Sequence, residues 1–171
     1  IYLDHVFYKT LDKAMKSESQ DPDIKRVVSV DIDSYNVLAV LRGKYWNLSP
    51  TDINELIVTT TPKVTRETLQ RIMNAEKISE AASELGDTVY REIIPQNVTD
   101  DIDIIMQLEA VFDGIGLKRV FSAFRSVFSV AIMLAALKLI MIEIRNLSAI
   151  ISGVEQKVSH DLIVSRLVTP D

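Results

Sequence analysis

The side chains in this sequence that could bind a metal ion or transfer a proton are mainly carboxylates, because it has two histidines and no cysteine. Without cysteine, a disulfide framework and any thiolate ligand or nucleophile are excluded, and the composition suits a reducing compartment. His5 and His160 are far apart and neither has a second histidine nearby. We therefore expect surface or helix-capping roles for them, not metal binding or catalysis.

Two groups of aspartates have a spacing that occurs at metal sites. Asp31 and Asp33 could begin a calcium loop, but its sixth position would be Asn36 instead of glycine, and its twelfth would be Arg42 instead of glutamate. The three aspartates within residues 100–103 could form half of a magnesium site, but no second acidic cluster accompanies them and helix capping explains them. Glycine-rich phosphate loops are absent from the sequence. We predict no metal, no cofactor and no small-molecule ligand.

A different polar pattern occurs twice and defines the candidate site. Asp33 precedes Asn36 by three residues, and Glu143 precedes Asn146 by the same spacing. Residues three apart lie on one face of a helix, so each pair points a carboxylate and an amide at the same neighbour. A buried carboxylate must be paired or hydrogen-bonded. We predict a polar clamp between the helices of each unit, with proton handling or metal binding as the alternative.

Helices must position these pairs, and helical periodicity fits nearly the whole chain. Valine and isoleucine also allow a strand over residues 24–41, but we predict an all-α fold. We expect breaks at Gly114 and Gly116 and within residues 125–129. We expect the helix over 130–152 to be buried on most of its circumference, because polar residues form only a narrow stripe along it. The residues predicted to cap helix N-termini are Asp21, Ser49, Thr65, Ser79 and Thr99.

The sequence repeats itself at a shift of 110 residues. Residues 32–59 align without a gap on residues 142–169, with eight identical positions. A shorter match of residues 3–7 to residues 108–112 has a shift of 105, so the units differ by a five-residue insertion between helices. We predict tandem helical units over 1–95 and 96–171. Their shared signature residues are Asp33, Asn36 and Gly43 in the first unit and Glu143, Asn146 and Gly153 in the second.

The signature of the second unit, Glu143-x-x-Asn146-Leu-x-x-Ile-x-x-Gly153, resembles the one that closes the C subunit of archaeal and bacterial A/V-type ATP synthases, the counterpart of the d subunit of the eukaryotic V-ATPase. The first unit carries a similar signature, and Thr88-Val-Tyr90 resembles the family's Thr-x-Tyr segment between units. Ser148 and Ser152 depart from the basic residues usual there. The family is a funnel of three such units, so the resemblance implies that an N-terminal unit is missing here.

This resemblance implies a non-catalytic central-stalk subunit. Such a protein would couple the rotor shaft, with its D- and F-type subunits, to the proteolipid ring on the cytoplasmic face of the membrane. Direct membrane insertion is not expected, because the longest uncharged run in the apolar region, residues 126–137, has twelve residues. A net charge of -5 with scattered basic residues disfavours nucleic-acid binding. The alternatives are a generic helical-repeat adaptor for another partner and a helical metal enzyme, for which ligand spacing is lacking.

Overall fold

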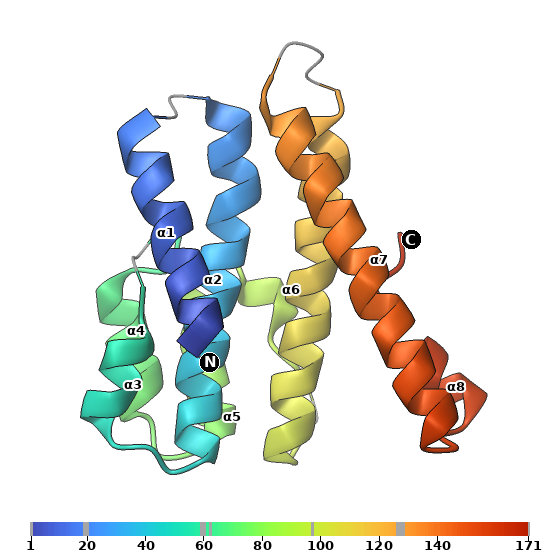
Figure 1. Ribbon diagram of the computed structural model, residues 1–171. Coiled ribbons are helices and arrows are strands. Elements are labelled where there is room, and N and C mark those ends of the chain that lie inside the picture. The colour runs from blue at the N-terminus through green and yellow to red at the C-terminus, as the bar shows by residue number, and fades with distance from the viewer. Residues whose placement is uncertain are drawn as a thin grey trace. The chain divides into compact units, whose positions relative to one another are not determined.

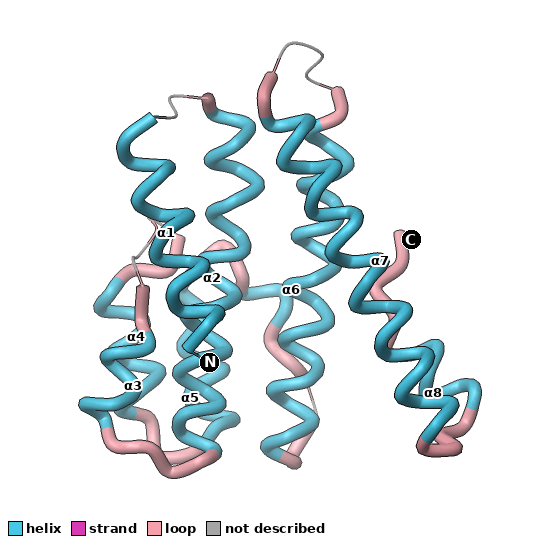
Figure 2. Tube along the Cα trace, viewed as in Figure 1, coloured by secondary structure: helices cyan, strands magenta, loops and turns pink. Residues whose placement is uncertain are grey.

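The computed structural model describes residues 2–18, 21–58, 61, 63–96, 98–125 and 129–170, with side chains for all of these except residues 2–4 and 14–18. Every regular element in these ranges is helical, which confirms the all-α prediction (Figure 1 and Figure 2). The α-helices are α1 (Tyr2–Glu18), α2 (Pro22–Tyr45), α3 (Pro50–Leu56), α4 (Arg66–Asn74), α5 (Ile78–Ser83), α6 (Asp101–Ala123), α7 (Ala131–Glu155) and α8 (His160–Val164). Two short 3-10 helices, η1 (Glu84–Asp87) and η2 (Arg91–Ile93), lie between α5 and α6.

The chain packs into two compact units. The first comprises Ile1–Gln20 with Val28–Phe112, and the second comprises Asp21–Val27 with Asp113–Asp171. Two long helices, α2 and α6, therefore contribute residues to both units. The predicted repeat units over 1–95 and 96–171 were defined by sequence similarity and not by packing, so these boundaries remain a prediction.

The first unit has a large apolar core in which α2 is the central helix. Helix α4 buries Leu69 and Ile72 completely, and Leu85 of η1 is also fully buried. The ring of Tyr90 meets Phe112 of α6 edge to face, with 5.0 Å between the ring centroids. The fully buried aliphatic residues of α2 in this unit are Val28, Val30, Ile32, Val37, Val40 and Leu41. This core holds the segment from α4 to η2 in a fixed place along α2.

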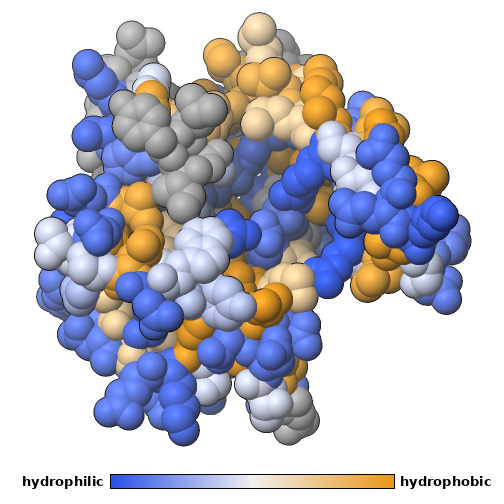
Figure 3. Space-filling model, turned by 60° about the horizontal axis from the view of Figure 1, so that its bottom comes forward, coloured by the Kyte–Doolittle hydropathy of each residue, from blue (hydrophilic) through white to orange (hydrophobic). Residues whose placement is uncertain are grey.

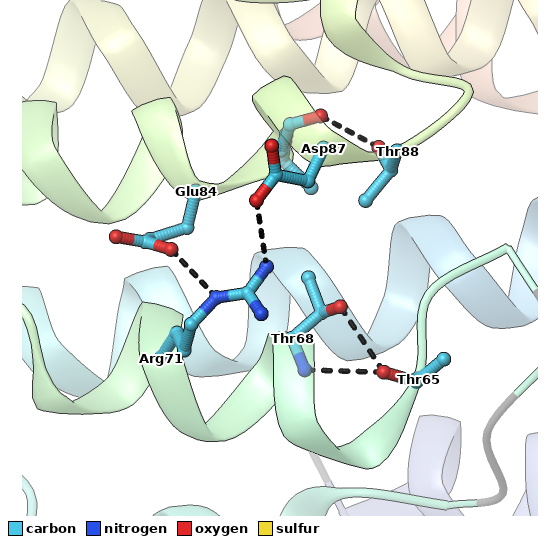
Figure 4. A network of polar contacts seen from close by, with 7 residues as sticks. Thr65, Thr68, Arg71, Glu84, Asp87 and Thr88 are labelled. Carbon is cyan, nitrogen blue, oxygen red and sulfur yellow. Dashed lines mark hydrogen bonds and ion pairs between the residues drawn. The ribbon is translucent and has the colours of Figure 1, made fainter.

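Polar contacts at the surface join α4 to the end of the α5–η1 segment (Figure 4). Arg71 of α4 donates from Nε to Glu84 at 2.8 Å, and its Nη2 lies 3.4 Å from Asp87. At the start of the same helix, the Thr65 hydroxyl accepts a hydrogen bond from the backbone N–H of Thr68. Because the ion pairs are exposed, they contribute less to stability than the apolar residues beneath them.

The second unit has a smaller core, built largely from alanine. Ala123 of α6 and Ala131 and Ala135 of α7 are buried there together with Val27 and Val120. At its edge, the Ser129 hydroxyl donates to Asp21 at 2.6 Å and accepts a hydrogen bond from the N–H of Ala131. These bonds fix the start of α7, and the hydroxyl lowers the pKa of Asp21.

Several predicted helix starts are confirmed. Ser49 caps α3 through the N–H of Asp52, and Thr65 caps α4. Asp21 accepts from the N–H of Asp23 and so begins α2. Two predicted caps are wrong. Helix α5 begins one residue before Ser79, and Asp100, not Thr99, accepts from the backbone at the start of α6. Aspartate caps as well as threonine does, and the two neighbours compete for the same place.

The expected break at Gly114 and Gly116 is wrong, because α6 continues through both residues to Ala123. Burial of apolar residues on both sides of these glycines, among them Phe112 and Leu117, outweighs the low helix propensity of glycine. The interruption expected within 125–129 agrees with the gap between α6 and α7, although residues 126–128 lie outside the described ranges.

The prediction that α7 is buried on most of its circumference is wrong. Leu137, Ile140, Leu147 and Ile151 are each more than half exposed. The described residues pack against one side of this helix, through its alanines near the start and through α8 near the end. Hydrophobic surface is correspondingly visible among hydrophilic residues in the part of the molecule formed by α7 and α8 (Figure 3).

Candidate functional site

The two signature asparagines hold the same place in the two units. The Oδ1 atom of Asn36 accepts a hydrogen bond from the N–H of Val58 at 3.0 Å. The Oδ1 atom of Asn146 accepts one from the N–H of Val168 at 3.0 Å, and its Nδ2 donates to the Val168 carbonyl at 2.9 Å. Each amide thus ties a long helix to the chain that follows the next short helix. The predicted polar clamp exists for both asparagines, with a backbone segment as the partner.

The two signature glycines allow a short helix to cross closely over a long one. A Cβ atom placed on Gly43 would lie 2.7 Å from Cγ1 of Ile53 in α3. A Cβ on Gly153 would lie 2.6 Å from Cγ1 of Ile163 in α8. Carbon atoms do not approach so closely without displacement, so a larger residue at either position would push the short helix away. The glycine is therefore part of the packing of each helical hairpin, which is the long helix together with the short helix that follows it.

The turn between the long and the short helix is also the same in both units. Asn47 has a positive φ of 55°, and Lys157, which aligns with it, has a φ of 56°. The N–H of Leu48 reaches the carbonyl of Gly43 at 2.9 Å, and the N–H of Val158 reaches that of Gly153 at the same distance. A residue in the left-handed backbone conformation, followed by a 6→1 hydrogen bond of this kind, is the Schellman motif that ends a helix. The repeat predicted from the sequence extends to backbone detail.

The first signature acid, Asp33, is completely buried, as predicted. Its Oδ2 accepts a hydrogen bond from the Tyr90 hydroxyl at 2.6 Å, and its Oδ1 accepts one from Thr61 at 2.5 Å. Loss of solvation raises the pKa of Asp33 to about 6, while the two hydroxyl donors and the charge of Lys63 act to lower that pKa. Lys63 itself donates to the hydroxyl of Ser29 at 3.1 Å. The carboxylate thus fastens the chain after α3 and the segment around η2 to α2.

The second signature acid does not behave in this way, and the prediction that Glu143 is buried and hydrogen-bonded is wrong. Its side chain is exposed, and no donor among the described residues contacts it. The counterparts of Thr61 and Tyr90, at the same shift of 110, would fall at or beyond residue 171, the last of the sequence. The burial of an acid at this position therefore depends on a segment that covers it, not on the signature itself.

The basic residues on either side of Gly43 both have partners within the first compact unit, which extends to Phe112 of α6. Arg42 pairs with Glu109 of α6 at 2.7 Å. The Nζ atom of Lys44 donates to the carbonyls of Met73 and Ala75 at 2.8 and 2.5 Å, and so satisfies the end of α4. In the second unit, Ser152 and Val154 occupy the aligned positions. The two units thus have the same backbone geometry at this turn but differ in the contacts that their long helices can make.

The two histidines and Asp31, which were considered for metal binding or catalysis, lie on three different helices. His5 contacts the Leu56 carbonyl through Nδ1 at 3.1 Å, and His160 is exposed at the start of α8. Asp31 lies on α2, two residues before Asp33. Across the described ranges, no three histidine or acidic side chains converge in a way that could hold a metal ion. No helix in the described part of the chain combines the length and the apolar character that are needed to cross a membrane.

Sequence reasoning missed the donors that satisfy Asp33. Tyr90 stands out in the sequence only as part of the Thr88-Val-Tyr90 segment, and Thr61 not at all. The available signal was the need of a buried carboxylate for hydroxyl or cationic partners. The same segment does make a local bond, because Thr88 accepts at its hydroxyl from the N–H of Tyr90 at 3.0 Å.

These shared features define a tandem helical-repeat protein in which an amide clamp and a glycine contact build each hairpin. Residues 1–166 match the family described as ATP synthase (C/AC39) subunit. The chain belongs to that family, which confirms the resemblance seen in the signatures.

One curated relative shows how much of a family member this chain represents. It is the C subunit of the A-type ATP synthase of Methanocaldococcus jannaschii, to which the chain is 26% identical over 171 residues. The match covers 98% of this chain and 43% of that protein, so the chain spans less than half of the relative's length. No solved structure matches the chain.

Proposed function

We propose that this chain is part of a non-catalytic central-stalk subunit of an A/V-type rotary ATP synthase, and that it couples the rotor shaft to the membrane proteolipid ring. The partners would be the D- and F-type shaft subunits on one side and the polar loops of the ring on the other. The protein would sit peripherally on the cytoplasmic face of the membrane, bound through the complex. Its role in ion transport would be mechanical.

The observation that carries this proposal is the family match over residues 1–166 together with the close repetition of the hairpin geometry. A part that transmits torque needs elements that do not shift under load. The asparagine clamps and the glycine contacts lock each short helix against its long helix at two points in each unit. Helical repeats built in this way supply extended, rigid surfaces for partners.

Binding to purified components tests the proposal. This chain, and a longer family member that contains it, would be presented separately to the shaft subunits and to the proteolipid ring in detergent. Saturable binding of the longer protein to either partner, with weaker binding of this chain, is the expected result. An ATP hydrolysis assay on the isolated chain should show no turnover.

Two controls make the result decisive. Circular dichroism establishes that each preparation is helical before it is tested. The variant Gln156→Ala, in an exposed residue after α7, should bind like the unchanged chain. If neither folded protein binds the shaft or the ring, the generic adaptor for another partner replaces this proposal, and measurable ATP turnover would contradict its non-catalytic part.

A further inference from the structure

Matching positions on α2 and α7 differ sharply in exposure. Val37 and Val40 of α2 have 0% exposed surface. Their counterparts 110 residues later, Leu147 and Ile150 of α7, are 58% and 36% exposed. The aligned positions hold apolar residues in both helices, but only those of α2 are buried. Composition alone therefore does not account for the difference.

The segment that follows α3 is bonded to both ends of this stretch of α2. Val37 and Val40 lie on one helical stripe between Asp33 and Lys44, at spacings of three and four residues. Tyr90 donates to Asp33 at one end of this stripe, and Lys44 donates to carbonyls at the end of α4 at the other. Helix α4 and the residues up to Tyr90 are thus held against α2 at both ends of this buried stripe.

The corresponding stripe on α7, which we call the α7 stripe, consists of Glu143, Leu147, Ile150 and Val154. It is continuous with further exposed apolar residues of the same helix, namely Ile140, Ile144 and Ile151. Contiguous apolar surface with an acid at one end is typical of a surface that another segment covers. A lipid surface fits it poorly, because Glu143 would have to be desolvated without a partner.

We propose that the α7 stripe is the docking surface for an amphipathic helical segment built like Arg66–Tyr90, supplied by a part of the longer polypeptide outside this chain. The segment would carry a Leu/Ile/Met stripe, as α4 does with Leu69, Ile72 and Met73, and a hydroxyl donor for Glu143. More than half of the M. jannaschii relative lies outside the matched region, which leaves room for such a segment. This inference rests on the repeat and on family membership, and not on the coupling role.

A second copy of this chain is a poorer occupant. Its own Arg66–Tyr90 segment is already buried against its own α2, with Leu69 and Ile72 fully covered. The chemistry of the far end of the stripe also differs from that of α2. Val154 replaces the lysine that satisfies the carbonyls at the end of α4, so water would satisfy the last carbonyls of a helix docked there.

The test supplies the occupant from the chain itself. A copy of residues 61–96 is appended after residue 170, where the shift of 110 places the counterpart of Thr61. Hydrogen exchange is then measured by mass spectrometry over residues 143–154. We expect exchange in this region to slow by at least about tenfold relative to the unextended chain, because α7 would be held on a second side.

Variants in the extended chain separate docking from a general effect. Leu147→Asp should abolish the added protection, and Glu143→Ala should reduce it, while Ser148→Asp, next to the stripe but exposed and outside it, should leave it unchanged. The proposal is overturned if the extension brings no protection, or if Ser148→Asp is as damaging as Leu147→Asp. It is also overturned if sedimentation shows that the unextended chain already covers α7 by forming a dimer. Shaft and ring binding is not measured in this test, so its failure leaves the proposed function standing.

Discussion

Arg145 of α7 donates to both carboxylate oxygens of Asp113 in α6, at 3.1 and 2.6 Å. In the first unit the aligned residues are Tyr35 of α2 and Tyr8 of α1, and their rings stack with centroids 4.6 Å apart. Two helices thus meet at the same place in both units, once through an aromatic pair and once through an ion pair. The repeat preserves the position of the contact and not its chemistry.

Removing the Arg145 pair should cost little. We expect a double-mutant cycle with Arg145→Gln and Asp113→Asn to give a coupling energy of about 0.5–1 kcal/mol, because both side chains are partly exposed. Urea unfolding at low salt measures it, and about 1 M NaCl should reduce it. A coupling energy above about 2 kcal/mol that does not respond to salt would contradict this account.

The asparagine clamps should contribute more than surface polar residues. Asn36→Ala leaves the N–H of Val58 without its acceptor, and we expect it to lower the free energy of unfolding by about 1–3 kcal/mol. Asn146→Ala should cost less, because Asn146 is only partly buried and water can replace its bonds. Chemical denaturation measures both, with exposed Gln156→Ala as the control. Equal effects for all three variants would show that the clamps contribute nothing specific.

The glycine contact gives a pair of opposite predictions. Gly43→Ala should destabilise the protein by about 1–3 kcal/mol, since its methyl group would collide with Ile53. Gly114→Ala in α6 should stabilise it by about 0.5–1 kcal/mol, because no atom lies within 4 Å of the added carbon and alanine favours the helix. Thermal unfolding of the two variants provides the comparison. A stabilised Gly43→Ala protein would mean that α3 does not need to approach α2 closely.

Burial of Asp33 should make stability depend on pH. Its pKa rises from 3.8 to about 6 on folding, so the folded state binds more protons in this interval. The contribution is fully present below pH 3.8 and is lost as the pH rises through 6, with a size of up to about 3 kcal/mol. Asp33→Asn removes this titration. The difference in unfolding free energy between the unchanged chain and this variant should therefore fall between about pH 4 and pH 7, and a constant difference would contradict the raised pKa.

Local signals predicted the helices well, and non-local contacts explain where the prediction was wrong. Proline and capping residues located the starts of α2, α3 and α4, and the self-comparison located the hairpins. Gly114 looked like a helix break because its intrinsic preference is visible in sequence, whereas the tertiary burial that overrides it is not.

The site divides in the same way. Asn36 and Asn146 were predicted correctly because their partners lie within the repeated 28-residue stretch that both copies contain. The environment of the acids depends instead on residues outside this stretch, such as Tyr90, which lies 57 positions after Asp33. A repeat in the sequence therefore predicts a shared hairpin, but it does not predict a shared environment.

The last prediction follows from this difference between the two acids. Asp33→Ala should destabilise the chain by about 1–3 kcal/mol at pH 7, because the Tyr90 and Thr61 hydroxyls lose their acceptor inside the core. Glu143→Ala should change the unfolding free energy by less than about 0.5 kcal/mol, because its side chain is exposed and alanine is a good helix former. Urea denaturation of both variants decides the matter. A loss above about 1 kcal/mol for Glu143→Ala would mean that this acid already has a partner within residues 1–171.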